Sequence, residues 1–297
     1  MFSRSTLLHL RIPFSYFLLP IFLFSLVISP NLLQQRMLWI LVILHIFLYP
    51  ASNGFNSYYD KDEKSIGGLK NPPPVSIGLL WMSLLFDAIA LVLGALKINL
   101  VFAVMLFVYG LASKAYSHPA IRLKQYPIAG WLVTGFFQGF FTFQMCYIGL
   151  NNYQPESALL PQAWIPASLA SLMLFANYPM TQVYQHEEDM KHGDRTLSMM
   201  LGIRGTFLFA AGFFVLTTLG FVIYFLQFYQ LRQALGFLTA LAPVGLYFGY
   251  WFWRVWHDPT KADFRHAMWM NFVSATSLVI YFVWFLFDTH NIGQYLF

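Results

Sequence analysis

A series of long apolar segments, running from near the first residue to near the last, restricts the fold more than any other feature. Nine windows of membrane-spanning length stand out, at about residues 12–29, 37–55, 76–95, 98–116, 127–149, 164–184, 205–228, 233–252 and 267–287. An α-helix needs about 20 apolar residues to cross the hydrocarbon core of a bilayer, and each window is close to that length. The sequence therefore predicts an all-α, polytopic membrane protein with nine transmembrane helices in a single domain, residues 1–297.

The composition favours a membrane protein over a soluble domain. Hydrophobic residues make up 58% of the chain and charged residues 10%, against about a quarter charged in an ordinary soluble domain. Cys146 is the only cysteine, so an intrachain disulfide is impossible and a cysteine-based metal site is not expected. The Lys and Arg residues are scattered among the loops, so the net charge of +5 reflects membrane topology rather than nucleic-acid binding.

The positive charges divide unequally between the two predicted membrane faces. With the N-terminus in the cytoplasm, the outer side keeps only Arg36, Lys97 and Arg232, and the other 14 of the 17 Lys and Arg residues fall on the inner side. Cytoplasmic loops of membrane proteins are enriched in Lys and Arg. We therefore expect a multi-pass integral protein of the bacterial inner membrane, with its N-terminus and its polar loops in the cytoplasm and its C-terminus outside.

A first polar cluster, residues 53–64, follows the second apolar segment. Asn56 and Asp60 are four residues apart, so they share a face if the helix continues into the cytoplasm. Glu63 returns to that face at i+7, whereas Asp62 points away unless the helix has already ended. Amide and carboxylate oxygens at this spacing are suited to one or two Mg²⁺ ions, which keep part of their coordination shell for phosphate oxygens. Alone, the cluster is equally compatible with a solvated helix end.

A second polar cluster, residues 182–197, follows the sixth apolar segment and contains four acidic residues. Gln185 and Asp189 repeat the spacing of four, and Gln182 and Glu188 lie on the same side of a helix. Taken alone, a solubilising polar loop would have the same composition. Because the charge distribution places both clusters on one membrane face, together they indicate a divalent-metal site for a phosphorylated lipid.

Two further polar stretches lie on the same face. In the stretch from Tyr116 to Lys124, Arg122 can neutralise phosphate as a planar fork and Lys124 as a point charge. Membrane topology alone is a competing explanation, since inner loops are basic in any case. The last inner loop, residues 257–266, is interpreted as a solvated connector rather than a lid.

These stretches resemble the motifs of the UbiA superfamily of intramembrane prenyltransferases. Asn56-Ser-Tyr-Tyr-Asp60-Lys-Asp62 looks like its first Asn/Asp-rich motif, and Lys70-Asn-Pro is similar to the basic element that follows. Tyr116-Ser117 with Arg122 and Lys124 is similar to the central Tyr-Ser…Leu-Lys element. The segment from Asp189 to Gly202 looks like the second Asp-rich motif with its Gly-x-x-Thr-Leu continuation. The order and the loop positions of these motifs agree along essentially the whole chain.

The resemblance implies a helical bundle around a central cavity, open laterally to lipid and capped on the cytoplasmic side. It also implies Mg²⁺ as cofactor, an isoprenyl diphosphate and a lipophilic acceptor as substrates, contact with membrane lipids, and no nucleic acid. The isoprenyl group would pass from the allylic diphosphate to an aromatic or other lipophilic acceptor, with release of diphosphate.

The motif positions then assign roles to individual residues. The expected catalytic residues are Asp60, Asp189 and Lys124. The expected diphosphate contacts are Asn56, Tyr116, Arg122, Lys124, Gln185 and Lys64. The expected metal ligands are Asn56, Asp60, Glu63, Glu188 and Asp189.

The chain departs from the family pattern at two positions. Lys64 stands where the first motif usually has a third acid, and Gln185 stands where an acid usually precedes Asp189 by four residues. Glu63 and Glu188, each one residue away, can replace these carboxylates on spacing. Alternatively, fewer metal charges are held and Lys64 itself contacts phosphate.

Three other functions compete with prenyl transfer as explanations of the sequence. A UbiA-type terpene synthase would cyclise the cation or trap it with water. A non-catalytic protein that binds isoprenoid lipids is consistent with the missing acids. An ion-coupled transporter is disfavoured, because transporter sites lie near the membrane midplane, whereas nearly all the acids here lie at one surface.

Overall fold

The computed structural model describes residues 3–290. In this part of the chain the secondary structure is helical, apart from turns and an isolated bridge between Ile66 and Leu69. The α-helices are α1 (Arg4–Leu10), α2 (Leu19–Val27), α3 (Gln34–Val42), α4 (Tyr49–Asp60), α5 (Ile77–Leu93), α6 (Leu100–Ser117), α7 (Pro127–Gly135), α8 (Thr142–Asn151), α9 (Pro161–Asn177), α10 (His186–Lys191), α11 (Leu197–Phe228), α12 (Leu231–His257) and α13 (Phe264–Thr289).

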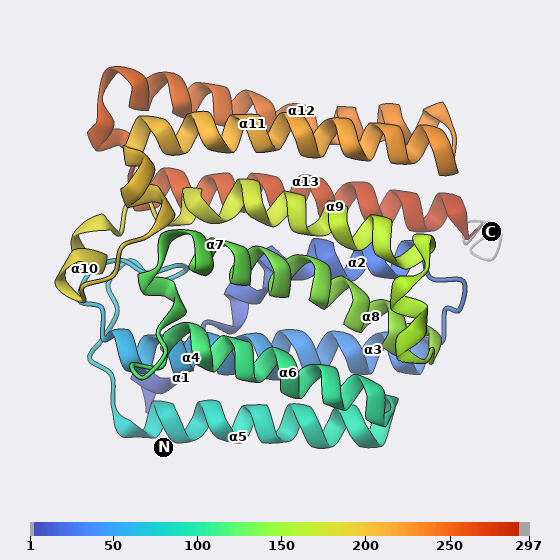
Figure 1. Ribbon diagram of the computed structural model, residues 1–297, viewed down its shortest axis with the longest axis horizontal. Coiled ribbons are helices and arrows are strands. Elements are labelled where there is room, and N and C mark those ends of the chain that lie inside the picture. Colours follow the sequence, from blue (N-terminus) through green and yellow to red (C-terminus); the bar gives the residue numbers. More distant parts are fainter. Residues whose placement is uncertain (1–2, 291–297) are drawn as a thin grey trace.

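Several of these helices join end to end, for example α3 with α4 and α7 with α8, and the long rods that result run alongside one another (Figure 1). Seven rods are long and apolar enough to cross a membrane: Arg4–Val27, Gln34–Asp60, Ile77–Ile98, Leu100–Ser117, Leu197–Phe228, Leu231–His257 and Phe264–Thr289. The rods formed by α7–α8 and by α9 run alongside them. The prediction of an all-α polytopic membrane protein is therefore confirmed.

Aromatic side chains fill the contacts between the rods. Phe24 of α2 stacks on Phe282 of α13, with ring centroids 4.9 Å apart, and also lies 5.2 Å from the rings of Phe143 and Phe221. Large apolar residues on the outer faces remain exposed, for example Leu246 at 76%. A bundle that leaves such residues uncovered along its rods is suited to contact with lipid.

Two of the differences between the predicted and the observed segment ends shape the site. The first rod begins at Arg4 rather than at residue 12, and it breaks at Arg11, which has a left-handed backbone (φ 49°) and precedes Pro13 by two residues. The sixth predicted segment, 164–184, is too long, because α9 ends at Asn177 and a short 3₁₀ turn follows. Pro179 lacks the N–H that a continuing α-helix would require at that position.

A close helix crossing fixes the position of α9. Between α7 and α8, residues 136–141 form a wider π-helical turn, and Gly139 in this turn faces α9. A Cβ atom on Gly139 would lie 2.5 Å from the Cα of Ser171, so only glycine allows this approach. The Ser171 hydroxyl donates to the Gly135 carbonyl at 2.8 Å and accepts from the Phe140 N–H at 3.0 Å, which satisfies two backbone groups there.

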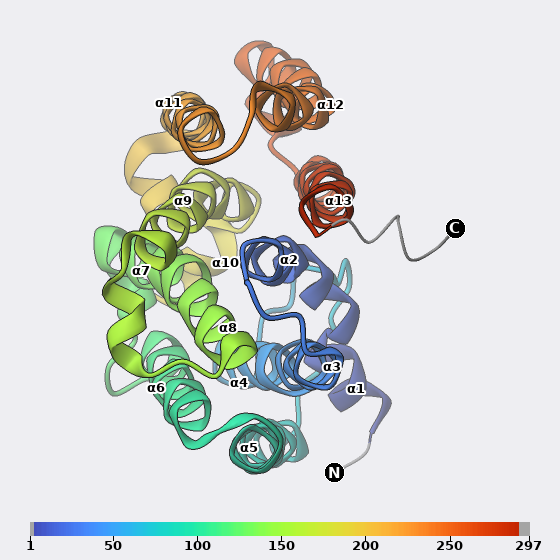
Figure 2. The same cartoon turned by 90° about the vertical axis from the view of Figure 1, so that its right-hand side faces the viewer.

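The loops 61–76, 118–126 and 182–196 gather at one end of the bundle, together with α1 and α10 (Figure 1). We call this the loop end. Viewed along the rods, α5 and α6 lie on one side of the bundle, and α11 and α12 lie on the opposite side (Figure 2). Segments that are far apart in the sequence therefore meet at the loop end.

Candidate active site

A cavity of about 270 Å³ lies inside the bundle and reaches the loop end. Its lining comes from the break in the first rod and from α4, α6, α7, α9, α10 and α13, so the expected central cavity is present. The polar lining residues near the loop end include Asn53, Asn56, Asp60, Asp62, Tyr116, Ser117, Lys124, Gln185 and Asp189. Farther along the helices the lining includes Phe17, Leu18, Tyr49, Tyr109, Val133, Phe137 and Leu174.

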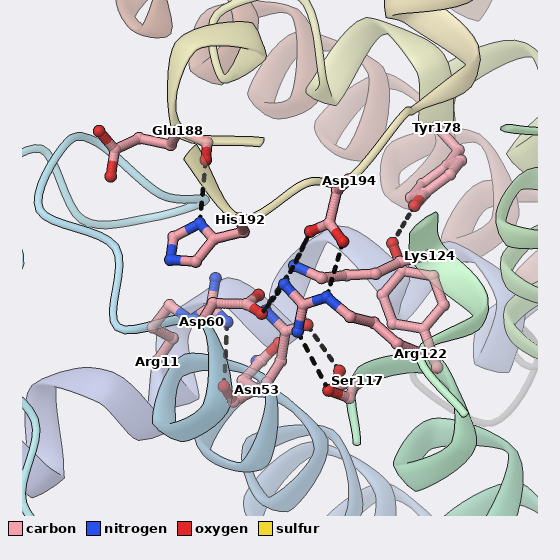
Figure 3. Close-up of polar contacts among 12 residues, drawn as sticks. Arg11, Asn53, Asp60, Ser117, Arg122, Lys124, Tyr178, Glu188, His192 and Asp194 are labelled. Carbon is pink, nitrogen blue, oxygen red and sulfur yellow. Dashed lines mark hydrogen bonds and ion pairs between the residues drawn. The ribbon is translucent and has the colours of Figure 1, made fainter. Parts of the chain in front are cut away.

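Asp60 and Lys124 meet at the polar part of the cavity (Figure 3). The Lys124 Nζ lies 2.6 Å from Asp60 Oδ1 and 2.9 Å from Asp194 Oδ2, and all three residues are buried. Burial on its own lowers the pKa of Lys124, but the carboxylates of Asp60 and Asp194 raise it above its ordinary value. Lys124 is therefore held as a cation in a buried position.

Arg122 lies behind this pair and not on the cavity wall. Its guanidinium forms a two-pronged contact with Asp194, with Nε 2.7 Å from Oδ1 and Nη2 2.8 Å from Oδ2 (Figure 3). The same Nη2 lies 3.4 Å from Asp60 Oδ1. Arg122 therefore has its donors committed to protein carboxylates, and it fixes the positions of Asp60 and Asp194 around Lys124.

Asp194 is a member of the site that the sequence did not reveal. It belongs to the second polar cluster, but its spacing there matches no helical face that contains Asp189. Gly193 has a left-handed backbone (φ 73°), and this turn lets the Asp194 N–H donate to the Asp189 carbonyl at 2.9 Å. Only the tertiary contact with Arg122 and Lys124 shows that Asp194 neutralises these cations.

Asp189 lines the cavity from α10. Its N–H donates to the Gln185 carbonyl at 2.9 Å, so these two residues share a face, as predicted, and both reach the cavity. The Asp189 Oδ2 atom is buried without a hydrogen-bond partner. Burial raises the pKa of Asp189 to about 7; Lys124 opposes this shift, and the nearby carboxylates of Asp194, Asp62 and Asp60 add to it. No cation among residues 3–290 lies within ion-pair distance of this carboxylate.

The helix end at Asp60 decides which acids of the first cluster face the cavity. Lys61 adopts a left-handed backbone (φ 50°) and terminates α4, so helical spacing no longer applies beyond it. Asp62 turns toward the cavity, where burial first and Asp60 second raise its pKa to about 6, partly offset by Lys124. Glu63, expected on this face at i+7, instead has 84% of its side chain exposed.

Four of the expected site residues lie outside the cavity lining: Arg122, described above, and Glu63, Lys64 and Glu188. The last three connect the first polar loop to α10. The buried Glu188 carboxylate accepts from the Glu63 N–H at 3.1 Å and from the Lys191 ammonium at 2.7 Å, while Lys64 pairs with Glu187. These contacts, which we call the loop clasp, hold the two acidic clusters side by side.

Two other expected contacts have polar partners at the cavity. The side-chain amide oxygen of Asn56, Oδ1, accepts from the Ser117 hydroxyl at 2.7 Å. The Tyr116 hydroxyl shares a hydrogen bond with the Tyr178 hydroxyl, and both tyrosines line the cavity. A further cation at the cavity, Arg11, belongs to none of the sequence motifs. It lines the cavity and donates to the carbonyls of Gly67 at 3.0 Å and Asn53 at 3.1 Å.

The lining suits a hard divalent cation that is only partly coordinated by protein. Within residues 3–290, no three His, Cys, Asp or Glu side chains gather closely enough to form a metal cage on their own. The carboxylates of Asp60, Asp62 and Asp189 nevertheless face one cavity, with the amides of Asn56 and Gln185 beside them. Mg²⁺ takes oxygen ligands and leaves positions for substrate phosphates. The unpartnered Asp189 oxygen fits such an ion.

Comparison with known proteins gives the family. The model of the UbiA prenyltransferase family matches residues 17–273. The chain is 27% identical, over 212 residues, to 2-acyl-4-prenylphloroglucinol 6-prenyltransferase, chloroplastic, of Humulus lupulus. This match covers 63% of the chain and 48% of the Humulus protein, so it spans about half the length of that relative.

Solved structures agree in fold. A UbiA homologue from Archaeoglobus fulgidus bound to DMAPP and Mg²⁺ superposes with a TM-score of 0.69 at 18% identity, covering 96% of this chain and 99% of that one. The same homologue bound to GPP and Mg²⁺ gives 0.67 at 19% identity, with coverage of 95% and 99%. A digeranylgeranylglyceryl phosphate synthase gives 0.59 at 17% identity, with coverage of 95% and 98%. Since the family model covers most of the chain and the fold agrees, the chain belongs to the UbiA prenyltransferase family.

Proposed function

We propose that this protein is a Mg²⁺-dependent intramembrane prenyltransferase that transfers an isoprenyl group from an allylic diphosphate to an aromatic or other lipophilic acceptor and releases diphosphate. One observation carries the proposal: a single buried cavity has Lys124 and three carboxylates at its polar end and aromatic side chains deeper inside. The Archaeoglobus fulgidus homologue bound to DMAPP or GPP with Mg²⁺ supports the donor class and the metal.

The proposed metal ligands are the oxygens of Asn56, Asp60 and Asp189, with Asp62 and Gln185 close enough along the lining to take part. Both cation contacts of Asp60 use Oδ1, which leaves Oδ2 for the metal. When bound, Mg²⁺ would neutralise the charge that develops on the departing diphosphate. Glu63 and Glu188 belong to the loop clasp in this proposal, and they hold the ligands' loops together.

Lys124 is the proposed diphosphate contact from the protein. Its ammonium is buried, lies on the cavity wall and is kept charged by Asp60 and Asp194. A fixed positive charge in a dry site stabilises a developing anion far more than it would in water. Asn56, Tyr116 and Gln185 would orient the diphosphate, and Arg122 acts through the carboxylates that hold Lys124 in place.

The deeper part of the cavity is suited to the isoprenyl group and its cation. Tyr109 lies between Tyr49, with ring centroids 6.2 Å apart, and Phe137, at 6.4 Å, and all three rings line the cavity. Aromatic faces attract a cation electrostatically and present no nucleophile to it. We assign these three rings to shielding the allylic cation until the acceptor attacks.

The loop end is proposed to face the cytoplasm of a bacterial inner membrane, where soluble allylic diphosphates and Mg²⁺ are available. The charge bias of the loops supports this orientation. A cysteine placed at the exposed Arg4 would test it, because Cys146 is buried. A membrane-impermeant maleimide should label this cysteine only after the cells are permeabilised. Labelling in intact cells would show that the loop end faces the outside.

The activity test uses purified protein with dimethylallyl, geranyl or farnesyl diphosphate, Mg²⁺, and a panel of phenolic and lipid acceptors. We expect diphosphate release that depends on Mg²⁺ and on one class of acceptor, with a prenylated product detected by mass spectrometry. A cyclised or hydroxylated product formed without an acceptor would make the protein a terpene synthase. Binding without release for every donor and acceptor would make it a carrier.

A further inference from the structure

A second cavity, of about 420 Å³, lies at the same end of the molecule but shares no lining residue with the first. It is formed where α12 ends and α13 begins (Figure 1). Three cations line it, Arg254, Lys261 and Arg265, and three aromatic residues lie beside them, Tyr247, Tyr250 and Trp269. We call this the α12–α13 pocket. The proposed prenyl transfer makes no use of it.

The positive charge of the pocket is incompletely neutralised. Among the residues that the structure describes, Asp263 is the one acid in the pocket lining, and its carboxylate accepts from the His266 backbone N–H and from its ring Nδ1, each at 2.9 Å. Lys261 has only a distant partner, Asp258 at 3.5 Å. In the described part of the chain, no carboxylate lies within 4.0 Å of the guanidinium of Arg254 or of Arg265. The pocket therefore attracts an anion.

Two tyrosines position Arg254 and join the two helices at the pocket. The Arg254 guanidinium donates to the Tyr250 hydroxyl at 2.8 Å and lies 5.7 Å from the centre of that ring. The Tyr247 hydroxyl donates to the His266 carbonyl at 3.3 Å, which ties α12 to α13 across the pocket. These contacts place Arg254 without neutralising it, so its remaining donors are available to a ligand.

The surroundings of the pocket indicate that the anion belongs to a lipid. Trp269 lines the pocket and is 50% exposed, and other large apolar side chains near the lining residues in sequence are also exposed on α12 and α13: Leu246 at 76%, Trp253 at 64% and Phe272 at 46%. Tryptophan and tyrosine at the ends of membrane helices occupy the level of the lipid head groups. A ligand with a phosphate head and long acyl chains satisfies both surfaces, whereas free phosphate would use only the cations.

We propose that the α12–α13 pocket binds the phosphate head group of an anionic phospholipid such as phosphatidylglycerol. Arg254 and Arg265 contact the phosphate, Lys261 adds charge at the rim, and the acyl chains follow the exposed faces of α12 and α13. Basic pockets between membrane helices are known to select anionic head groups. The bound lipid would stabilise the pairing of α12 with α13 at the loop end.

The test measures lipid binding to the purified full-length protein, both by native mass spectrometry and by the shift in thermal unfolding temperature. Dioleoyl phosphatidylglycerol, dioleoyl phosphatidylcholine and inorganic phosphate are compared. We expect only phosphatidylglycerol to be retained and to raise the unfolding temperature. Each cation is worth about fivefold in affinity, so R265Q should bind about fivefold more weakly and R254Q/R265Q about 25-fold more weakly.

Arg4→Gln is the matched control, because Arg4 is an exposed cation at the same end of the bundle and does not line the pocket. R4Q should bind phosphatidylglycerol like the unmodified protein, and R265K should recover most of the binding. Equal retention of phosphatidylglycerol by R254Q/R265Q and R4Q would overturn the proposal. Equal stabilisation by inorganic phosphate would also overturn it, because the acyl chains would then contribute nothing.

Discussion

Asp60 and Asp189 line the same cavity in different electrostatic states. Asp60, at the end of a long membrane helix, is already paired with Lys124 at 2.6 Å and has Arg122 nearby. Asp189, on a short helix of six residues between loops, has a buried oxygen with no partner and a pKa raised to about 7. The first carboxylate is neutralised by the fold itself, and the second remains to be neutralised by a ligand.

The two carboxylates therefore have different tasks within one site. Asp60 contributes to the stability of the fold, and Asp189 is available to a ligand. Breaking a buried ion pair leaves an uncompensated charge and costs several kcal/mol. Removing a buried carboxylate that has no partner relieves a desolvation cost. Substitution of Asp60 should therefore lower the stability of the folded protein, whereas substitution of Asp189 should leave it unchanged or raise it. Both substitutions should slow the reaction.

The largest effect is expected for Lys124→Met. This variant should lower the rate of diphosphate release by about 10²–10³-fold, because a fixed cation at the leaving group is lost. It should also destabilise the protein by roughly 3–5 kcal/mol, because Asp60 and Asp194 lose a buried partner. Steady-state rates and thermal unfolding check both effects, with Lys124→Arg as the charge-preserving control. A K124M enzyme within tenfold of the normal rate would remove Lys124 from the mechanism.

A comparison of Asp60→Asn with Asp189→Asn tests the two electrostatic states directly. Both variants should reduce Mg²⁺-dependent turnover by on the order of 100-fold, because each removes a charged ligand. In EDTA, D60N should unfold at a lower temperature than the unmodified protein, whereas D189N should unfold at the same or a higher temperature. Equal destabilisation by both would show that the two carboxylates do not differ as described.

The raised pKa of Asp189 predicts how the protein responds to pH without metal. The folded protein keeps this proton to about pH 7, whereas the unfolded chain releases it near 3.8. The folded state thus binds more protons between these values, so stability should fall as pH rises from about 4 to 7. Mg²⁺ affinity should rise instead, by about tenfold between pH 6 and 8, since the metal needs the ionised form. Unfolding experiments and Mg²⁺ titrations at several pH values measure the two trends. Both trends should be weaker in D189N.

The smallest effects concern the two positions that depart from the family pattern. Gln185 lines the cavity, so Gln185→Asp should strengthen Mg²⁺ binding about three- to tenfold by adding a ligand charge. Lys64 is exposed in the loop clasp, so Lys64→Gln should change kcat/KM by less than about threefold, as expected for a surface ion pair. Calorimetry measures the Mg²⁺ affinity of Q185D, and steady-state kinetics measure kcat/KM for K64Q. A tenfold rise in KM for K64Q would restore Lys64 as a phosphate contact.

The long apolar segments predicted the architecture because membrane helices depend on local composition. The spacing of four placed Asn56 with Asp60, and Gln185 with Asp189, on shared helix faces, and the family resemblance added Lys124 and the central cavity. All five residues line one cavity in the structure. Helical spacing gave the wrong position for Glu63, because α4 ends at Lys61 in a left-handed backbone conformation. A lysine at this position does not predict a helix end.

Other features of the site depend on tertiary contacts. The roles of Asp194 and Arg122 arise from a contact between loops about 70 residues apart in the sequence, and no local pattern encodes it. Glu188 was expected at the cavity by its neighbours' spacing, but Lys191 and the backbone of the first loop bind it instead. The same limitation applies to the α12–α13 pocket, where residues interpreted as a solvated connector help to line a cavity.

The most direct test of the central claim is an anomalous diffraction map of the protein crystallised with Mn²⁺ and a non-hydrolysable geranyl diphosphate analogue. We expect metal density within about 2.5 Å of carboxylate oxygens from both Asp60 and Asp189. The diphosphate should lie between these two residues and beside Lys124. Metal held by Glu63 and Glu188, or a diphosphate bound away from Lys124, would contradict the claim.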